Sequence, residues 1–150
     1  MNKLIRPALA CLLMLPTSFA LAATDAECTV DWKKADIKNA SVLTESESPR
    51  YFAALRVAGK PVADGKLTQA QFLEYCKAGL FTSAKIDTGA PLAGSNSFTE
   101  TQAMDRAVAA GFSKVTGLKK DNQGVWRGTA SDGTKTVNIA IDYKGNVVAK

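Results

Sequence analysis

A polar segment over residues 82–96 separates two stretches of different periodicity, and this change constrains the fold more than any other feature. The segment contains Gly89 and Pro91 together with several Ser, Thr and Asn residues, a composition typical of a linker. Apolar residues recur at helical spacing before it and alternate with polar residues after it. The pattern predicts an α+β fold, with a helical unit over residues 23–81 and an α+β unit over residues 97–150.

Residues 1–22 have the features of a signal peptide and are excluded from the fold. Lys3 and Arg6 supply a positive amino-terminal region, and an apolar stretch follows them. Ala20-Leu21-Ala22 then places small residues where a signal peptidase cuts. The apolar stretch is too short to span a bilayer, which needs about 20 residues. We therefore expect cleavage after Ala22, a periplasmic or secreted protein, and no membrane association of the mature chain.

Two cysteines, Cys28 and Cys76, remain once the signal peptide is removed. An isolated pair in an exported chain predicts one disulfide bond. The bond closes a long loop, for which the chain-entropy model gives about 4 kcal/mol of stabilisation. Two free buried thiols are the alternative.

Capping signals predict helices in the first unit. Thr68 followed by Gln71 forms a capping box at the start of one helix. A further short helix is expected after Cys28, and this helix should carry Trp32. Both helices lie in the part of the chain that the disulfide would tie together.

An earlier helix of the same unit has two candidate starts. Thr44 with Glu47 forms one capping box. Ser48 followed by Pro49 offers the other start, with a capping serine and a proline at the first helical position. The sequence leaves both starts open.

The second unit is predicted to begin with a helix and to continue as an antiparallel meander. Thr99 followed by Gln102 forms a capping box at the helix start. Asp132-Gly133 predicts a hairpin turn between two alternating runs. The last long run has Val137, Ile139 and Ile141 on one face and Asn138, Ala140 and Asp142 on the other. We expect the helix to cover the apolar face and the second face to be open to solvent.

Several segments of this unit together form a known pattern. They are Ala109-Ala110-Gly111-Phe112, Val115, Gly124-Val125-Trp126-Arg127-Gly128, Asp132-Gly133, Val137-Asn138-Ile139-Ala140-Ile141-Asp142 and Lys144-Gly145-Asn146-Val147. On these segments residues 97–150 resemble the PepSY family of small exported bacterial modules. The resemblance implies one helix packed on a small antiparallel β-meander. It also implies a protein-binding or inhibitory role without enzymatic activity.

The open face of the predicted sheet, or one of its edge strands, is the expected binding surface. An extended partner segment gains affinity there through backbone hydrogen bonds. Basic side chains favour an acidic partner or one that offers a terminal carboxylate. The predicted binding residues are Trp126, Arg127, Lys135 and Asn138. A tryptophan on an alternating strand more often belongs to the core, so the core is the competing and commoner interpretation for Trp126.

Residues 36–47 and 60–71 have the spacing of calcium loops that lead into a helix. On these segments the first unit resembles a degenerate EF-hand pair. A calcium loop needs several oxygen ligands, but Lys38 and Lys60 occupy two ligand positions. Calcium binding no tighter than about millimolar is therefore the alternative function. Its ligands would be Asp36, Glu47 and Asp64.

The chain contains no histidine, which excludes Ser-His-Asp and Cys-His catalysis and histidine-bound zinc or copper. The 14 acidic residues leave a small carboxylate-dependent hydrolase as a second alternative. Removal of the signal peptide leaves 17 basic residues and a net charge of +3. This weak charge predicts no nucleic-acid binding. The expected partner is a protein or peptide, and apart from weak calcium no cofactor is expected.

Overall fold

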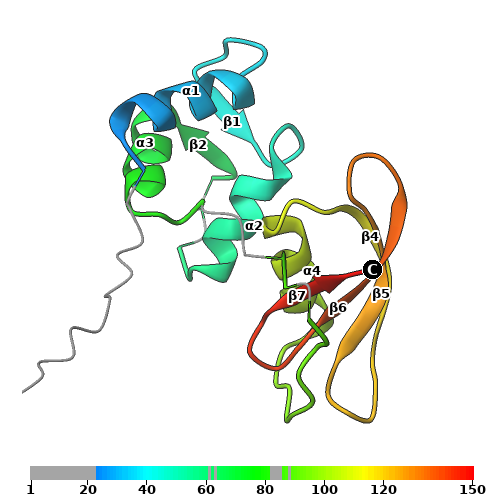
Figure 1. Cartoon of the computed structure of the whole chain (residues 1–150). Coiled ribbons are helices and arrows are strands. Elements are labelled where there is room, and N and C mark those ends of the chain that lie inside the picture. The colour runs from blue at the N-terminus through cyan, green and yellow to red at the C-terminus, as the bar shows by residue number, and fades with distance from the viewer. Residues whose placement is uncertain (1–22, 61, 63, 82–85, 88) are drawn as a thin grey trace, which may run out of the picture.

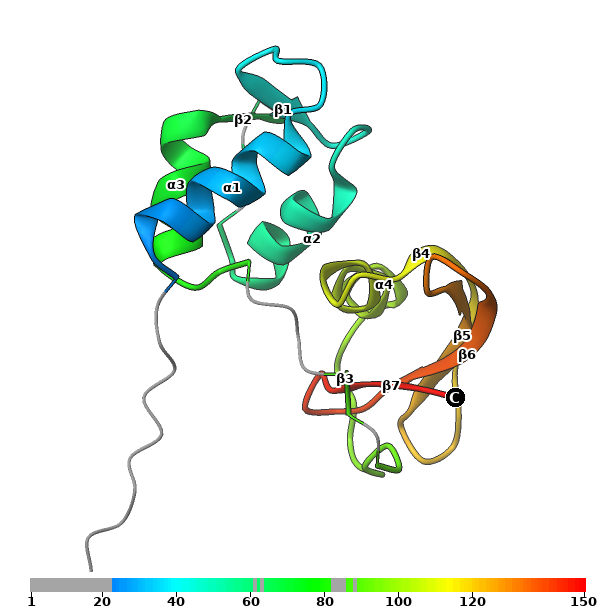
Figure 2. The same ribbon diagram turned by 45° about the horizontal axis from the view of Figure 1, so that its top comes forward.

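The computed structural model describes residues 23–60, 62, 64–81, 86–87 and 89–150. The predicted signal peptide and part of the predicted linker lie outside these residues. The first unit contains α1 (Asp25–Ala35), β1 (Val42–Thr44), α2 (Pro49–Val57), β2 (Lys66–Thr68) and α3 (Gln69–Lys77). Further along the chain lie β3 (Ile86–Asp87), α4 (Glu100–Ala109), β4 (Ser113–Lys120), β5 (Trp126–Ser131), β6 (Thr136–Ile141) and β7 (Val147–Ala149). Figure 1 shows these elements apart from β3, which is labelled in Figure 2.

In the described part of the chain, three of the four helices begin at a capping box, which satisfies backbone N–H groups that have no partner inside the helix. The boxes pair Thr24 with Glu27, Thr68 with Gln71, and Thr99 with Gln102. The second and third boxes confirm the sequence predictions. The first box starts α1 ahead of Cys28 rather than after it, and Trp32 lies on this helix as expected.

Helix α2 begins at the second of its two candidate starts. Ser48 is the N-cap residue, and Pro49 occupies the first turn. Thr44 and Glu47 bond each other, with the Thr44 Oγ1 and a Glu47 carboxylate oxygen 2.7 Å apart. However, Thr44 ends strand β1, so this pair closes the turn between β1 and α2 rather than capping the helix.

A disulfide bond and a buried aromatic ring hold the first unit together. Cys28 of α1 is bonded to Cys76 of α3, with their Cα atoms 5.8 Å apart, which confirms the predicted disulfide. The fully buried ring of Phe72 lies 5.3 Å from the ring of Trp32 and 4.8 Å from that of Tyr51, both in edge-to-face contact. Strands β1 and β2 form an antiparallel pair, and the other buried members of this core are Leu43, Phe52, Leu55 and Leu67.

The second unit is a sheet with α4 on one face, which confirms the α+β fold. The strand order is β3-β7-β6-β5-β4, and all neighbours are antiparallel except the parallel pair β3–β7. Ala103 and Ala107 of α4 are fully buried, and their small side chains let the helix lie close to the sheet. The apolar face of β6 packs in this core, as predicted, through Val137, Ile139 and Ile141.

Helix α4 also contacts α2, and this α2–α4 contact joins the two units. Figure 2 shows α4 between α2 and the strands. Ala53 and Ala54 of α2 form a small buried cluster with Ala109 of α4. Beside this cluster, the Arg56 guanidinium donates two hydrogen bonds to Asp105, from Nε to Oδ2 at 3.0 Å and from Nη2 to Oδ1 at 2.7 Å.

Replacing Cys28 or Cys76 with Ser should lower the free energy of unfolding of the mature protein by about 2–5 kcal/mol. Each substitution removes the same covalent constraint, so the two variants and the double variant should be equally destabilised. Urea unfolding without reductant measures the loss, and mass spectrometry of the purified exported protein counts its thiols. Two free thiols in the native protein would contradict the assignment.

Asp105→Asn should destabilise the mature protein more than Glu45→Gln does. The Asp105 side chain is 13% exposed and accepts both hydrogen bonds from Arg56, so its loss should cost about 1–3 kcal/mol. Glu45 bonds the same guanidinium at 2.7 Å, but its side chain is 51% exposed, and its loss should cost at most about 1 kcal/mol. Urea unfolding of both variants makes the comparison. Equal losses would contradict the larger contribution of the bonds between Arg56 and Asp105.

Candidate functional site

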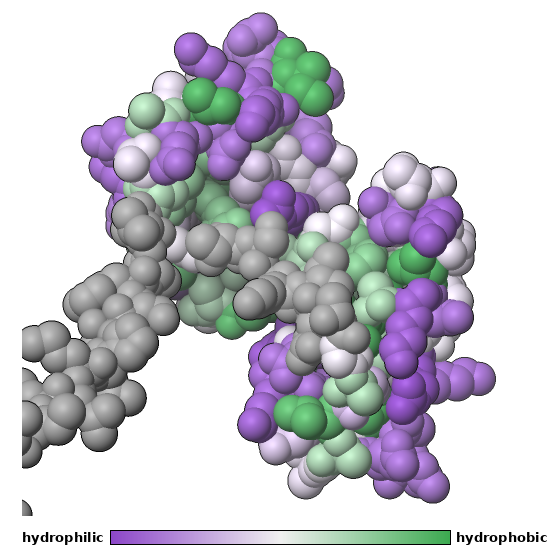
Figure 3. Space-filling view, in the orientation of Figure 1, coloured by the Kyte–Doolittle hydropathy of each residue, from purple (hydrophilic) through white to green (hydrophobic). Residues whose placement is uncertain are grey.

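The sheet face turned away from α4, which we call the outer face, presents two rows of side chains. Side chains alternate along a strand, so residues that pair across the strands point to the same face. The strand register aligns Lys119, Arg127, Ala140 and Val148 in one row and Thr116, Thr129, Asn138 and Lys150 in the next. In Figure 3 hydrophilic side chains line the side of the molecule where β4 and β5 lie.

Residues 91–96, which we call the strap, cross one end of the outer face. The backbone N–H of Leu92 donates to Oδ2 of Asp142 at 3.3 Å, and that of Gly94 donates to the carbonyl oxygen of Gln123 at 2.9 Å. Gly124 has a φ of +75°, and a Cβ at this position would overlap the carbonyl oxygen of Gly94. The strap is therefore held against the β4–β5 and β6–β7 turns.

The strap changes the character of the outer face from the one expected. Asn138 is exposed as predicted, but Ala140 is only 6% exposed and Asp142 only 1%. The expectation of open Ala140 and Asp142 is wrong because a distant part of the chain folds back over this end of the sheet. Ala140 instead joins a small buried apolar cluster with Val125 and Val148.

Asp142 is the residue that ties the strap to the sheet. Its Oδ1 accepts hydrogen bonds from the backbone N–H groups of Lys144 and Asn146, at 2.9 and 3.0 Å. Its Oδ2 accepts one from the Asn146 side chain at 2.8 Å in addition to the one from Leu92. Burial raises the pKa of this carboxyl, but the hydrogen bonds outweigh burial and hold the pKa below its ordinary 3.8. The carboxylate is therefore ionised at neutral pH.

Next to the strap, the outer face forms a groove of about 300 Å³. Ala140 and Val148 form the floor, Pro91 of the strap forms a wall, and the rim carries Arg127, Asn138 and Lys150. An apolar floor with a few polar groups around it is typical of ligand sites in proteins.

The rim of the groove is cationic. Arg127 donates from Nε to Asp121 at 2.7 Å, and this bond uses one of the five N–H groups of its guanidinium. Hydrogen bonds from the Val125 backbone and from Arg127 lower the pKa of Asp121, so this pair is ionised. Within the described residues, Lys119 and Lys150 take part in no ion pair. The positive charge of the rim is therefore only partly neutralised.

The four predicted binding residues separate into two groups. Arg127 and Asn138 lie together in the groove. Trp126 is half-buried against the core on the helix side, and its indole N–H donates to the carbonyl oxygen of Phe98 at 3.2 Å. Lys135 is exposed in the β5–β6 hairpin and does not line the groove. The sequence named all four as binding residues, and the structure brings only Arg127 and Asn138 together. Trp126 packs against the core, the other place considered for it.

Pro91 and Lys150 line the groove but were missed from the sequence. Lys150 exchanges backbone hydrogen bonds with Asn138, at 3.1 and 3.0 Å, and this pairing places both side chains on the outer face. Knowledge of the β6–β7 register would therefore have indicated Lys150. Pro91 has no comparable local signal, because only the path of the strap brings it to the sheet.

The residues of the calcium alternative are engaged elsewhere. The Asp36 carboxylate accepts two backbone N–H groups of its own loop, at 2.8 and 3.0 Å. Glu47 lies 2.6 Å from the ammonium group of Lys38, whose hydrogen bond is the main cause that lowers the pKa of Glu47 to about 2. Among the described residues, which include Asp64, no three His, Cys, Asp or Glu side chains form a group that could hold a metal ion.

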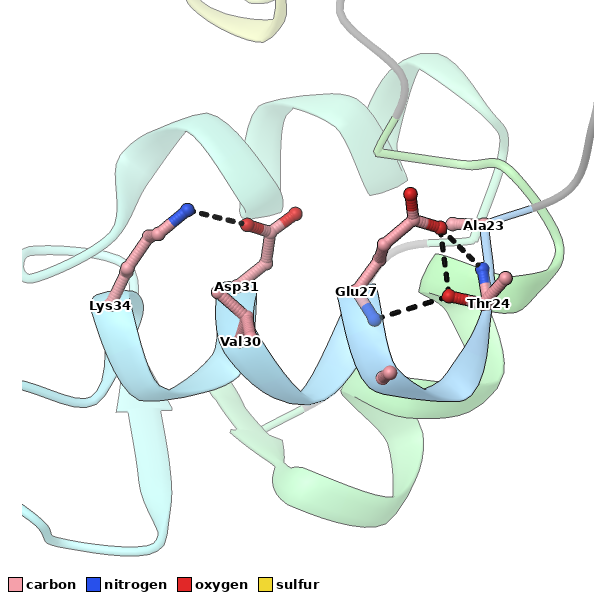
Figure 4. A pocket seen from close by; sticks show the side chains of 7 residues that line it. Ala23, Thr24, Glu27, Val30, Asp31 and Lys34 are labelled. Atoms are coloured by element: carbon pink, nitrogen blue, oxygen red, sulfur yellow. Dashed lines mark hydrogen bonds and ion pairs between the residues drawn. The ribbon is translucent and has the colours of Figure 1, made fainter.

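A second hollow lies along α1, on the side drawn in Figure 4. Its polar side chains bond each other within the helix, with Thr24 to Glu27 at 2.9 Å and Lys34 to Asp31 at 3.3 Å. These contacts are a helix cap and an exposed ion pair. All the residues that form them belong to α1 or to its N-cap. The groove on the sheet, whose rim comes from three strands, is the better candidate.

Comparison of the chain with models of protein families, with curated proteins and with solved structures found no match. The resemblances to the PepSY family and to EF-hands therefore stay predictions. None of the described helices has the length and apolar character needed to cross a membrane.

Asp142→Asn should lower the free energy of unfolding by about 1–3 kcal/mol, because an amide cannot accept all four hydrogen bonds and leaves a buried donor unpaired. The folded-state pKa of Asp142 lies below its unfolded value, so its contribution is present above about pH 4 and is lost as the pH falls through the folded-state pKa. The variant should therefore lose less stability than the parent between about pH 5 and about pH 3. Urea unfolding at both pH values measures this, and equal acid losses would contradict it.

Proposed function

We propose that this protein is an exported, non-enzymatic module that binds a peptide or protein segment on the outer face of its sheet. The groove beside the strap carries the proposal, because it brings Arg127 and Asn138 from neighbouring strands to the rim of one apolar floor. Export is supported by the predicted signal peptide and by the disulfide, which is typical of oxidising compartments such as the periplasm.

The sheet edges support binding on the face rather than strand addition at an edge. Strand β4 contains two shifts of register and a non-glycine residue with positive φ, Lys114 at 51°. Such irregular, lysine-bearing edges resist pairing with another chain. The opposite edge of the sheet is β3, a strand of only 2 residues beside β7, and very short edge strands offer little backbone for pairing. The outer face itself remains the accessible surface next to the predicted binding residues.

The carboxylates near the groove support a binding role over a hydrolase. Asp121 accepts backbone hydrogen bonds from Gln123 and Val125 and a bond from Arg127. Asp142 is buried and accepts four hydrogen bonds. A general acid needs a raised pKa and access to substrate, whereas both of these carboxyls have a lowered pKa.

Selection of peptides from a displayed library on the mature protein tests the proposal. Asn138→Trp fills the groove from an exposed position and should weaken the selected peptides at least about tenfold, which corresponds to ~1.4 kcal/mol. Asn122→Trp, in the exposed β4–β5 turn, is the matched control and should leave binding unchanged. Failure to select any peptide, or selected peptides that bind Asn138→Trp normally and crosslink near Tyr51, would refute the proposal.

A further inference from the structure

The outer face places its cations at opposite corners of the groove. Arg127 lies on β5 in the row of Ala140, and Lys150 follows β7 in the row of Asn138. They are separated by two strand spacings and by one step of two residues along the strands. Ideal strand geometry gives a diagonal of roughly 12 Å between these positions. The apolar floor of the groove lies between the two corners.

On this geometry, and resting on the proposed function, we propose that the ligand is an acidic extended segment with two carboxylates four residues apart and an aliphatic residue midway between them. Residues four apart in an extended chain are separated by roughly 13 Å and point to the same side. One carboxylate then bonds Arg127 and the other Lys150. The aliphatic side chain between them packs on Ala140 and Val148.

The distribution of charge over residues 93–150 favours this acidic occupant. Eight basic residues face five acidic ones there. Four of the five acids are engaged inside the protein: Asp105 by Arg56, Asp121 by Arg127 and two backbone N–H groups, Asp132 by the β5–β6 hairpin, and Asp142 by the strap and its own turn. Few acidic side chains of the protein are therefore left to neutralise the rim of the groove, and acidic groups of a ligand can do so. Complementary charges of this kind raise both the selectivity and the rate of association.

Arg127 keeps binding capacity despite its bond to Asp121. That bond uses Nε, whereas a carboxylate is best bound through paired N–H groups of the guanidinium fork. Lys119 is the direct neighbour of Arg127 across the β4–β5 pair and adds a second positive charge at this corner. The strap already shows that an extended segment can bind to this face, because it is an irregular segment that lies on the adjoining part of it.

The test uses a fluorescein-labelled Glu-Ser-Val-Ser-Glu peptide with blocked ends, titrated into the mature protein at physiological salt. Its neutral Gln-Ser-Val-Ser-Gln analogue and a Glu-Glu-Ser-Val-Ser peptide of the same composition are the reference ligands. The first peptide should bind more tightly than both. Arg127→Gln and Lys150→Gln should each weaken its binding by about two- to fivefold, the range for exposed ion pairs.

Lys114→Gln and Lys135→Gln are the matched controls, because each removes one exposed positive charge outside the groove. Both should leave affinity nearly unchanged at physiological salt, where charges more than about 8 Å apart are screened. Lys150 is exposed and forms no ion pair within the described residues, so Lys150→Gln should leave the fold intact. Melting curves check this for both variants; in Arg127→Gln the former partner Asp121 retains its backbone bonds.

Equal binding of the acidic and neutral peptides, or equal effects of groove and control variants, would overturn the inference. If neutral peptides still bind and Asn138→Trp blocks them, the proposed function survives this failure. A sulfated polysaccharide serves as a third probe. Binding of that polyanion with the same dependence on Arg127 and Lys150, without binding of the acidic peptide, would assign the groove to a non-peptide anion and would also overturn the inference.

Discussion

The packing of α4 on two sides is the constraint on which the rest of the structure depends. One side of this helix contacts the sheet through Ala103 and Ala107, and another contacts α2 through Ala109. Small side chains on both sides allow close approach, and the paired hydrogen bonds from Arg56 to Asp105 select the register of the two helices. Because α4 covers the inner face of the sheet, a ligand that binds on a face of this sheet is limited to the outer face.

The strap then determines how much of the outer face remains. A buried carboxylate is costly unless it is hydrogen-bonded, and Asp142 meets this requirement with four donors, one of them from the strap. The same contact that satisfies Asp142 brings Pro91 to the edge of the groove. The need of buried Asp142 for hydrogen-bond donors thus shapes the proposed binding surface beside it.

Charge shows why composition alone is a poor guide to a site. The excess of basic residues after residue 93 is modest, and the sequence does not show where it acts. In the structure most acids of this region are bound by neighbouring N–H groups and arginines, while Lys119 and Lys150 stand on the outer face. The local charge of the groove therefore exceeds what the overall balance suggests.

The sequence by itself determined the features that depend on residues close together in the chain. The capping boxes at Thr68 and Thr99 and the alternation of β6 were predicted, because a helix cap or a strand face involves neighbours within a few residues. For α2 the sequence offered two starts, and the structure has the one at Ser48 and Pro49. The disulfide was predicted as well, since two cysteines in an exported chain have one pairing.

Only the tertiary structure decided which predicted residues share a site. Arg127 and Lys150 line the same groove through the register of three strands, and buried Asp142 is bonded by a strap 50 residues earlier in the chain. Strand alternation puts Trp126 on the face opposite Arg127, but only the packing of α4 decides that this face is the core. Contacts of this kind depend on how separate elements pack, and no local pattern of residues encodes them.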